Sequence, residues 1–559
     1  MAFQRYVLIA GIVVLSLLLM IRWGEFQQKH AALNAAPQSV ARTEGSLPAV
    51  AGGAELPSAS SAQATALPGA NAETSGTPPT ANRYVRVQTD VFDIKLDLLG
   101  GDIVYTALPK YSAKLETPDV PFELLQENEK RQYVARTGLI GVDKGMSGRP
   151  LYQTDAAEYH MADDADTLTV VLHTTRDNID VEKRFIFHRG DYLVTIDYTA
   201  ANKSEQPWSG AVFGQLTRDS SPDPSVATGG FGVSSFLGGA TNKIDPSSTT
   251  SEGYHKIKFK DMKDSPLKVQ QQGGWIAIVQ HYFLAAWIPA ADQQSEFKTA
   301  ADGDLHSVSF AGTSQVVAPG ASGHFSAQLY MGPKDQNRLR TISPGLDLSV
   351  DYGILWWIAQ PLFLLLTKLH GWLGNWGWSI MVLTLLVKSA FFWLNAKAYT
   401  SMANMRRVQP KLTEIRERYA DDKQKQSQEM MSLYKTEKIN PLGGCLPMVV
   451  QMPVFFALYW MLLESVDLRH APWILWIHDL SAMDPFYVLP LLMGATMFFQ
   501  QRLNPPPPDP MQAKVMQWMP VMFTFFFLWF PAGLVLYYIV NNLLSIVQQY
   551  IITKRLNPS

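Results

Sequence analysis

Apolar residues follow two different patterns along this chain of 559 residues. Residues 83–345 alternate between apolar and polar positions, which is typical of strands with one buried face. Continuous apolar runs instead occupy residues 6–21 and much of the chain after residue 353, with lengths that approach those of membrane-spanning helices. The pattern predicts a mixed fold, in which a large all-β domain precedes an α-helical membrane domain.

The first apolar run begins after Arg5 and ends before Arg22. A cleaved signal peptide needs small residues directly after its apolar run, and charged and bulky residues occupy that place here. We therefore predict an uncleaved signal anchor over residues 1–24, with a cleaved signal peptide as the alternative. Residues 25–82 are rich in Ala, Pro, Ser, Gly and Thr, and they are predicted to form a disordered linker.

The β domain is predicted over residues 83–345, where runs rich in β-branched and aromatic residues are separated by turn signals. A sandwich of two antiparallel sheets fits such a pattern. The spacing of its acids and histidines is not that of metal ligands, so neither a metal site nor a cofactor is expected. The single cysteine, Cys445, excludes an intrachain disulfide bond.

Six apolar stretches follow the β domain, and several are close to the lower length limit for a membrane span. They are 353–366, 378–394, 446–463, 486–499, 515–530 and 534–552. The segment 395–440 carries ten basic and six acidic residues, whereas 464–485 carries four acidic residues and one arginine. Because Lys- and Arg-rich loops stay in the cytoplasm, 395–440, 500–514 and the tail are predicted to be cytoplasmic and 464–485 external.

This orientation requires an odd number of spans between the β domain and the basic segment. The stretch 353–366 is shorter than 378–394, contains Gln360-Pro361 and is flanked by tryptophans, so it is predicted to lie in the outer interface. The sequence thus predicts six transmembrane helices, with both termini in the cytoplasm. The predicted boundaries are 1–24 signal anchor, 25–82 linker, 83–345 β domain, 346–375 interfacial helix, 376–396 second span, 397–440 basic hairpin, 441–464 third span, 465–484 external loop, 485–501 fourth span, 502–512 cytoplasmic loop, 513–530 fifth span, 532–553 sixth span and 554–559 tail.

Two helices joined near Asp421-Asp422 are predicted within 397–440, because apolar residues recur on one face of each half. The alternative is a solvated charged loop. A basic hairpin beside a membrane could meet anionic lipid, ribosomal RNA or an acidic partner. The net charge of −2 implies no general attraction to nucleic acid, and no DNA partner is expected. The candidate contact residues are Arg406, Arg407, Lys411, Arg416, Arg418, Lys423 and Lys425.

Lys388 is the most unusual residue of the predicted bundle, because it lies in an otherwise uncharged apolar run, 378–394. A lysine at the centre of a spanning helix costs about 2.5–3.5 kcal/mol on insertion scales, so it is retained where it faces water, a partner or a substrate. The alternative is a side chain that snorkels to the interface. Lys388 lies about nine residues, or roughly 13 Å, inside the predicted cytoplasmic boundary, which favours a polar cavity.

Other polar residues of the spans are predicted to share this cavity. Thr384 lies one helical turn before Lys388 on the same face, and Gln451 lies between two prolines of the third span. The last span adds Tyr537, Tyr538, Asn541 and Asn542. Each alone is more often a helix-packing group. No acid accompanies the lysine, so we predict attraction of an acidic polar segment rather than a proton relay.

No motif for covalent chemistry occurs in the spans. The sequence has no GxxxxGK[ST] or HExxH pattern, and no GxSxG pattern occurs within a span. Ser389 follows Lys388 directly and therefore points about 100° away from it on a helix, which argues against a Ser-Lys protease. No catalytic residue is predicted, and the chain is not expected to be an enzyme.

Three segments, 440–462, 475–494 and 525–542, closely resemble the YidC/Oxa/Alb family of membrane protein insertases. The resemblance follows the chain in order and implies a periplasmic β-supersandwich, similar to galactose mutarotases, with a five-helix core in the bacterial inner membrane. It implies an insertase and chaperone that works alone or with the Sec translocon, through a hydrophilic groove open to cytoplasm and lipid. Implied partners are nascent membrane proteins, such as the ATP synthase c subunit and phage-coat-like proteins, together with translocon accessory subunits, the ribosome, the signal recognition particle pathway and membrane lipids.

The resemblance also implies roles for particular residues. The groove residues would be Lys388, Thr384 and Tyr538, in addition to Gln451 from the polar pattern above. The apolar surface that contacts clients would include Met452, Pro453 and Phe455. The family usually has arginine at the position of Lys388, so the bidentate geometry toward a carboxylate is lost while the charge is kept. The basic tail is short, which weakens the case for ribosome contact there. A transporter or channel, and a periplasmic carbohydrate-binding module, are the alternative functions.

Overall fold

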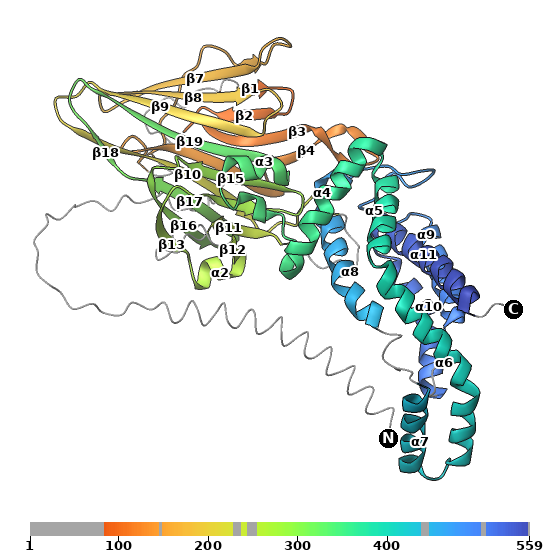
Figure 1. Ribbon diagram of the computed structural model, residues 1–559. Coiled ribbons are helices and arrows are strands. Elements are labelled where there is room, and N and C mark those ends of the chain that lie inside the picture. Colours follow the sequence, from red (N-terminus) through yellow and green to blue (C-terminus); the bar gives the residue numbers. More distant parts are fainter. Residues whose placement is uncertain are drawn as a thin grey trace, which may run out of the picture. The chain divides into compact units, whose positions relative to one another are not determined.

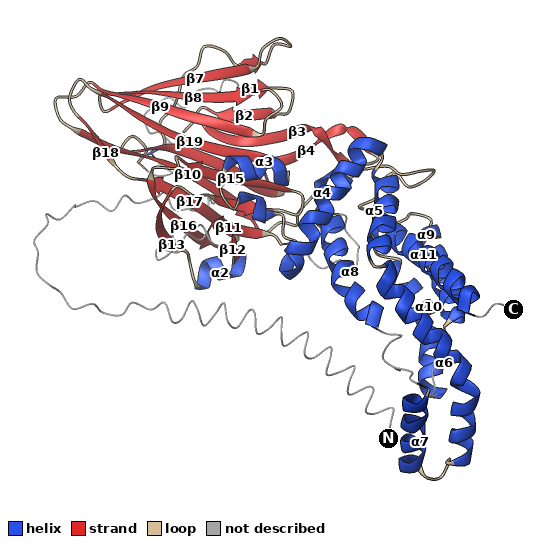
Figure 2. Ribbon diagram, viewed as in Figure 1, coloured by secondary structure: helices blue, strands red, loops and turns tan. Residues whose placement is uncertain are grey.

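The computed structural model describes residues 83–144, 148–226, 236–242, 254–437, 446–504 and 510–556 (Figure 1). The predicted signal anchor and linker lie outside the described residues. Strands dominate up to residue 333 and helices dominate afterwards (Figure 2). This division confirms the predicted fold class, a β domain followed by a helical domain.

The first sheet of the β domain has 11 strands, with the order β13-β16-β17-β10-β5-β4-β3-β2-β1-β6 and β18 paired to β10. Its pairs are antiparallel except for the short parallel pair of β1 and β6. Its strands are β1 (Tyr84–Gln88), β2 (Asp93–Asp97), β3 (Asp102–Lys114), β4 (Thr117–Asn128), β5 (Arg131–Ile140), β6 (Glu158–His160), β10 (Trp208–Asp219), β13 (Lys268–Gln272), β16 (Gln294–Asp302), β17 (Leu305–Gly312) and β18 (Gln315–Val317).

The second sheet has eight strands in the order β12-β11-β14-β15-β19-β9-β8-β7. Its strands are β7 (Thr167–Arg176), β8 (Ile179–His188), β9 (Leu193–Asn202), β11 (Gly238–Asn242), β12 (Tyr254–Lys258), β14 (Ile276–Val279), β15 (Phe283–Pro289) and β19 (Ser322–Pro333). Alternate residues of β9, such as Val194 and Ile196, are buried in the same apolar core as Ile103 and Leu216 of the first sheet. Side chains from both sheets therefore form one core, as in a β-sandwich.

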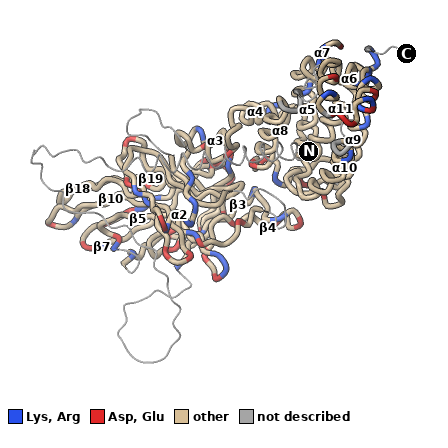
Figure 3. The backbone as a smooth tube through the Cα atoms, turned by 90° about the horizontal axis from the view of Figure 1, so that it is seen from below, with Lys and Arg blue, Asp and Glu red and all other residues tan. Residues whose placement is uncertain are grey.

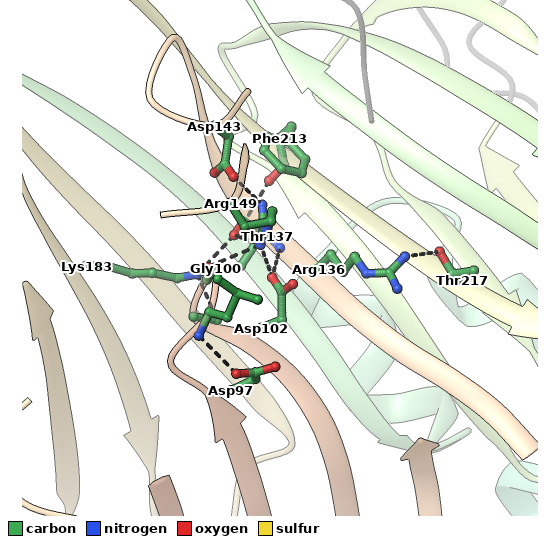
Figure 4. A network of polar contacts seen from close by, with 12 residues as sticks. Asp97, Gly100, Asp102, Arg136, Thr137, Asp143, Arg149, Lys183, Phe213 and Thr217 are labelled. Atoms are coloured by element: carbon green, nitrogen blue, oxygen red, sulfur yellow. Dashed lines mark hydrogen bonds and ion pairs between the residues drawn. The ribbon is translucent and has the colours of Figure 1, made fainter. Parts of the chain in front are cut away.

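A buried polar network interrupts this apolar core (Figure 4). Lys183 of β8 is completely buried and donates hydrogen bonds to the carbonyl oxygens of Gly101, Thr137 and Gly100, at 2.7, 3.0 and 3.2 Å. Arg149 forms ion pairs with both Asp102 and Asp143. Burial lowers the pKa of Lys183 to about 7 and raises the pKa of Asp143 to about 6.

Helices make up most of the described chain after β19. One further helix, α2 (Phe259–Asp264), lies within the β domain. The others are α3 (Gln336–Ile342), η3 (Leu346–Ser349), η4 (Gly353–Leu355), α4 (Trp356–Leu373), α5 (Trp376–Ala390), α6 (Phe392–Arg418), α7 (Lys423–Thr436), α8 (Leu446–Glu464), η5 (Val466–Leu468), α9 (Val488–Leu503), α10 (Pro510–Phe527) and α11 (Ala532–Leu556).

Length and apolar composition single out one helix that could cross a membrane by itself in the part of the chain that the structure describes. It is Ala532–Arg555 of α11. The pair α5 and α6, bent by 67°, also qualifies if it is counted as one broken span, and the segment Val450–Glu464 is apolar but shorter. The number of spans, predicted as six, therefore stays a prediction.

The turn between α4 and α5 is encoded locally. Gly374 ends α4 with a φ of 66°, a conformation that glycine adopts without steric cost, and its amide donates to the carbonyl of His370. The side chain of Asn375 then caps α5 by accepting from the amide of Trp378 at 3.2 Å. These two residues bring α4 back against α5, where both contribute to one apolar core with α8 and α11.

Candidate functional site: a polar centre between three helices

Lys388 lies in the last turn of α5, just before the bend into α6. Its side chain is buried, with 7% of the residue exposed. The ammonium donates to Oγ of Ser545 at 2.8 Å and approaches Oε1 of Gln451 at 3.5 Å. No carboxylate of a described residue lies within ion-pair distance of it. The lysine is therefore enclosed among neutral polar groups from α8 and α11.

The neutral groups around Lys388 are also bonded to one another. Nε2 of Gln451 donates to Oδ1 of Asn541 at 2.9 Å, and Oγ of Ser545 donates to the carbonyl oxygen of Asn541 at 2.7 Å. Asn541 and Ser545 are four residues apart on α11 and so share a face of that helix. We call Lys388, Gln451, Asn541 and Ser545 the polar centre.

Two of the predicted groove residues lie outside this hydrogen-bond network. Thr384 is buried, and its hydroxyl donates to the carbonyl of Ile380 in its own helix at 2.6 Å. Tyr538 packs its ring against Phe455 and Phe527, each with ring centres 4.8 Å away. The structure thus joins Lys388 to Gln451 directly, and it places Thr384 and Tyr538 in packing positions.

The predicted client-contacting residues of α8 point in different directions. Met452 is exposed, with 44% of its surface accessible, and Phe455 contacts Tyr538. Pro453 lines an apolar pocket of about 560 Å³, together with residues of α4 and α5 such as Leu362 and Leu386. Met452 is therefore the most accessible of the three predicted contact residues.

Several polar residues of α11 were not among the predicted site residues. Ser545 is one of them, and Gln548 and Gln549 are two others. Nε2 of Gln548 donates to the carbonyl of Phe392, and Nε2 of Gln549 donates to the carbonyl of Leu503. The spacing of Asn541, Ser545 and Gln549 at intervals of four is a helical signal that could have identified this polar face.

The basic hairpin consists of α6 and α7, which pack through a small apolar cluster around Val408 and Leu412. Figure 3 shows Lys and Arg recurring along α6 and α7. Several of the predicted contact residues have partners within the protein. Arg406 donates to the carbonyl of Leu503, Arg407 and Lys411 approach Glu437, Arg418 pairs with Glu414, and Lys425 lies over the ring of Tyr419. Arg416 is half-buried, and its carbonyl accepts from Gln426.

The described part of the chain has no candidate metal site, because no three His, Cys, Asp or Glu side chains in it are placed to hold an ion.

The fold and the polar centre together define a class of protein. It is a helical membrane protein with a large β-sandwich domain and a buried polar centre that carries one charge. Residues 84–365 match the family model described as the YidC periplasmic domain, and residues 368–559 match the model described as 60Kd inner membrane protein. The chain belongs to the YidC family of membrane protein insertases.

Relatives match this chain along its whole length. The membrane protein insertase YidC of Stutzerimonas stutzeri strain A1501 is 48% identical over 573 residues, covering 100% of this chain and 99% of that protein. The YidC insertase of Pseudomonas putida strain GB-1 is 49% identical over 570 residues, with the same coverage. A crystal structure of an active YidC insertase with its first transmembrane domain resolved shares 17% identity and a TM-score of 0.37, covering 84% of this chain and 92% of that chain. The two family models and the full-length relatives show that the chain is a membrane protein with a periplasmic domain.

Proposed function

We propose that this chain inserts and folds integral membrane proteins in the bacterial inner membrane, through a hydrophilic groove centred on Lys388. The observation that carries this function is the buried lysine surrounded by neutral acceptors. A positive charge without a neutralising carboxylate attracts an acidic polar segment of a client, and the surrounding polar groups lower the cost of bringing that segment into the membrane. No bond of the client is made or broken.

The clients are small membrane proteins, such as the ATP synthase c subunit and phage-coat-like proteins. Hydrophobic spans of a client leave the groove along Met452 and Phe455 of α8. The chain works alone or with the Sec translocon and its accessory subunits, and the basic hairpin contacts the ribosome, the signal recognition particle pathway or anionic lipid. Similarity to proteins named membrane protein insertase supports the insertase function, on which these proposed clients and partners depend.

In the proposed topology both termini and the basic hairpin are cytoplasmic. Six spans follow the boundaries expected from the sequence, and α4 lies along the periplasmic interface. Its exposed tryptophans support this placement, since 56% of Trp356 and 84% of Trp372 are accessible and such rings favour the headgroup region. The broken pair α5 and α6 would carry Lys388 toward the cytoplasmic side of the bundle.

The experiment that tests the function replaces Lys388 in cells depleted of their own insertase. Lys388→Arg keeps the charge and is expected to insert a two-span client normally, whereas Lys388→Ala and Lys388→Glu are expected to insert it poorly. Ser389→Ala is the matched control, because Ser389 is the next residue, is exposed, and its hydroxyl donates to the carbonyl of Leu385 in its own helix. Normal insertion by both Lys388→Ala and Lys388→Glu would show that the charge has no function.

A further inference from the structure

Ser545 makes the shorter of the two hydrogen bonds that reach Lys388. The two residues are 157 positions apart in sequence, on α11 and α5, and 1% of Ser545 is exposed. A hydroxyl has one hydrogen to donate and two lone pairs to accept with. The hydrogen of Ser545 is directed to the carbonyl of Asn541, at 2.7 Å. An oxygen lone pair of Ser545 accepts from the ammonium of Lys388, and the hydroxyl of Tyr399 is also in hydrogen-bond contact with this serine.

Asn541 also orients Gln451, the second acceptor for the ammonium of Lys388. Its Oδ1 accepts from Nε2 of Gln451, and this bond turns Oε1 of Gln451 toward Lys388. If the side-chain amide of Gln451 were turned the other way, its NH₂ group would face the ammonium of Lys388. Two donors would then face each other with no acceptor between them. Asn541 thus orients both acceptors, one through its backbone carbonyl and the other through its side chain.

Two neutral acceptors hold the ammonium without cancelling its charge. A carboxylate at the same place would form a buried ion pair and reduce the attraction for a client's acidic group. An ammonium has three N–H donors, and Ser545 and Gln451 account for two of them. Among the described residues only these two side chains accept from it, so the third N–H is left for an acceptor on a client. Lysine is a flexible point charge without the rigid fork of arginine, so its position depends on such neighbours.

We infer that Ser545 is a positioning residue, which holds the charged Lys388 ready to select clients with acidic translocated segments. This inference rests on the proposed insertase function and adds a preference among clients. Gln451 and Asn541 act with Ser545, and the three keep the lysine charged and directed into the groove. The client chemistry is a short polar segment that carries Asp or Glu between two apolar spans.

The test compares two clients in cells depleted of their own insertase. One is a two-span protein whose translocated loop carries two aspartates, and the other is the same protein with asparagines at those positions. Ser545→Ala removes the acceptor and is expected to lower insertion of the acidic client about tenfold, as for loss of one hydrogen bond to a charged group. Insertion of the neutral client is expected to fall much less than that of the acidic client, because its loop has no charge for Lys388 to attract. Ser545→Thr restores the hydroxyl and is expected to restore insertion.

Two further variants make the outcome decisive. Ser545→Cys keeps a side chain of similar size but replaces the hydroxyl with a thiol, which is a weak acceptor. It is used in place of Ser545→Ala if the alanine variant does not accumulate in the cells. Ser545→Asp is expected to abolish the preference for the acidic client. Equal loss of both clients, or no loss of either, would overturn the positioning role. If the unchanged protein inserts neither client, the proposed function itself is wrong, and this result is distinct from a loss of preference.

Discussion

The ammonium of Lys334 lies 2.7 Å from Oε2 of Glu464, and both side chains are almost completely buried. Lys334 directly follows β19, the last strand of the β domain, and Glu464 is the last residue of α8. The other carboxylate oxygen of Glu464 lies 3.8 Å from Nδ1 of His281, whose pKa is lowered by burial. A buried ion pair therefore links the β domain to the end of a helix of the polar centre.

Breaking this pair should destabilise the protein strongly. Lys334→Met or Glu464→Gln leaves the other residue without its partner in a buried place, which costs about 3–5 kcal/mol. The double variant Lys334→Met/Glu464→Leu should lose less than either single variant, because no unpaired charge remains. Thermal unfolding of the detergent-solubilised full chain measures the effect.

The matched control for this pair is Lys110, which forms an ion pair with Asp90 at 3.1 Å while 52% of its side chain is exposed. Lys110→Met should cost no more than about 1 kcal/mol, since exposed pairs are screened by water. Equal losses for Lys334→Met and Lys110→Met would contradict a structural role for the buried pair.

A second prediction concerns Lys183, the buried lysine of the β domain. Its pKa falls from 10.5 to about 7, because burial and the charge of Arg149 disfavour the ammonium. Between these two values the unfolded chain binds more protons than the folded one, so stability rises with pH. The free energy of unfolding of the full chain should increase by up to about 1.4 kcal/mol per pH unit above pH 7, relative to Lys183→Met. Urea unfolding at pH 7, 8 and 9 measures this difference, and parallel pH profiles would refute it.

The sequence predicts a feature of this protein where the residues that cause it are close together along the chain. Alternation alone was enough to predict strands such as β9, and Lys388 was conspicuous because its neighbours along the chain are apolar. Lys183 also had a local signal, since it occupies the inward phase of β8 with Val181 and Phe185. Its three carbonyl partners, however, come from distant segments, and no periodicity predicts such contacts.

The contacts of the polar centre could also be predicted only in part from the sequence. Lys388 and Gln451 were predicted from local patterns, whereas the role of Ser545 depends on which faces of α5 and α11 meet. Small hydroxyl residues are common in membrane helices, so Ser545 carried little information until its contact with Lys388 was known. The directions of Met452, Pro453 and Phe455 likewise follow from packing, because adjacent helix positions point to different sides.

A third prediction concerns Asp484, which is buried before the first turn of α9. One of its oxygens accepts from Nε1 of Trp476 and the amide of Phe486, each at 3.0 Å, and the other accepts from the amide of Leu489 at 2.7 Å. Asp484→Ala leaves three donors without a partner and should cost about 3 kcal/mol. Asp484→Asn should cost less, because one oxygen remains. Thermal unfolding of the full chain measures both losses.

Asp479 provides the control for Asp484, because it lies in the same loop and its Oδ1 accepts from the amide and hydroxyl of Ser481. Asp479→Ala should cost about 1 kcal/mol, as for an ordinary hydrogen-bonded side chain. If Asp479→Ala is as destabilising as Asp484→Ala, the three hydrogen bonds of the Asp484 carboxylate have no special contribution.

The last prediction concerns the basic hairpin. Arg407 and Lys411 both approach Glu437, and their side chains are mostly exposed. Arg407→Glu/Lys411→Glu should leave the stability of the protein within about 1 kcal/mol, because exposed ion pairs contribute little. Binding of the full chain to ribosomes should weaken, and the log–log slope of affinity against salt should shrink by about one to two, because two phosphate contacts are lost. Sedimentation with ribosomes at several salt concentrations measures both quantities. Lys110→Glu, a charge reversal in the β domain, should leave them unchanged, and equal affinity of all variants at every salt concentration would exclude the hairpin as the contact.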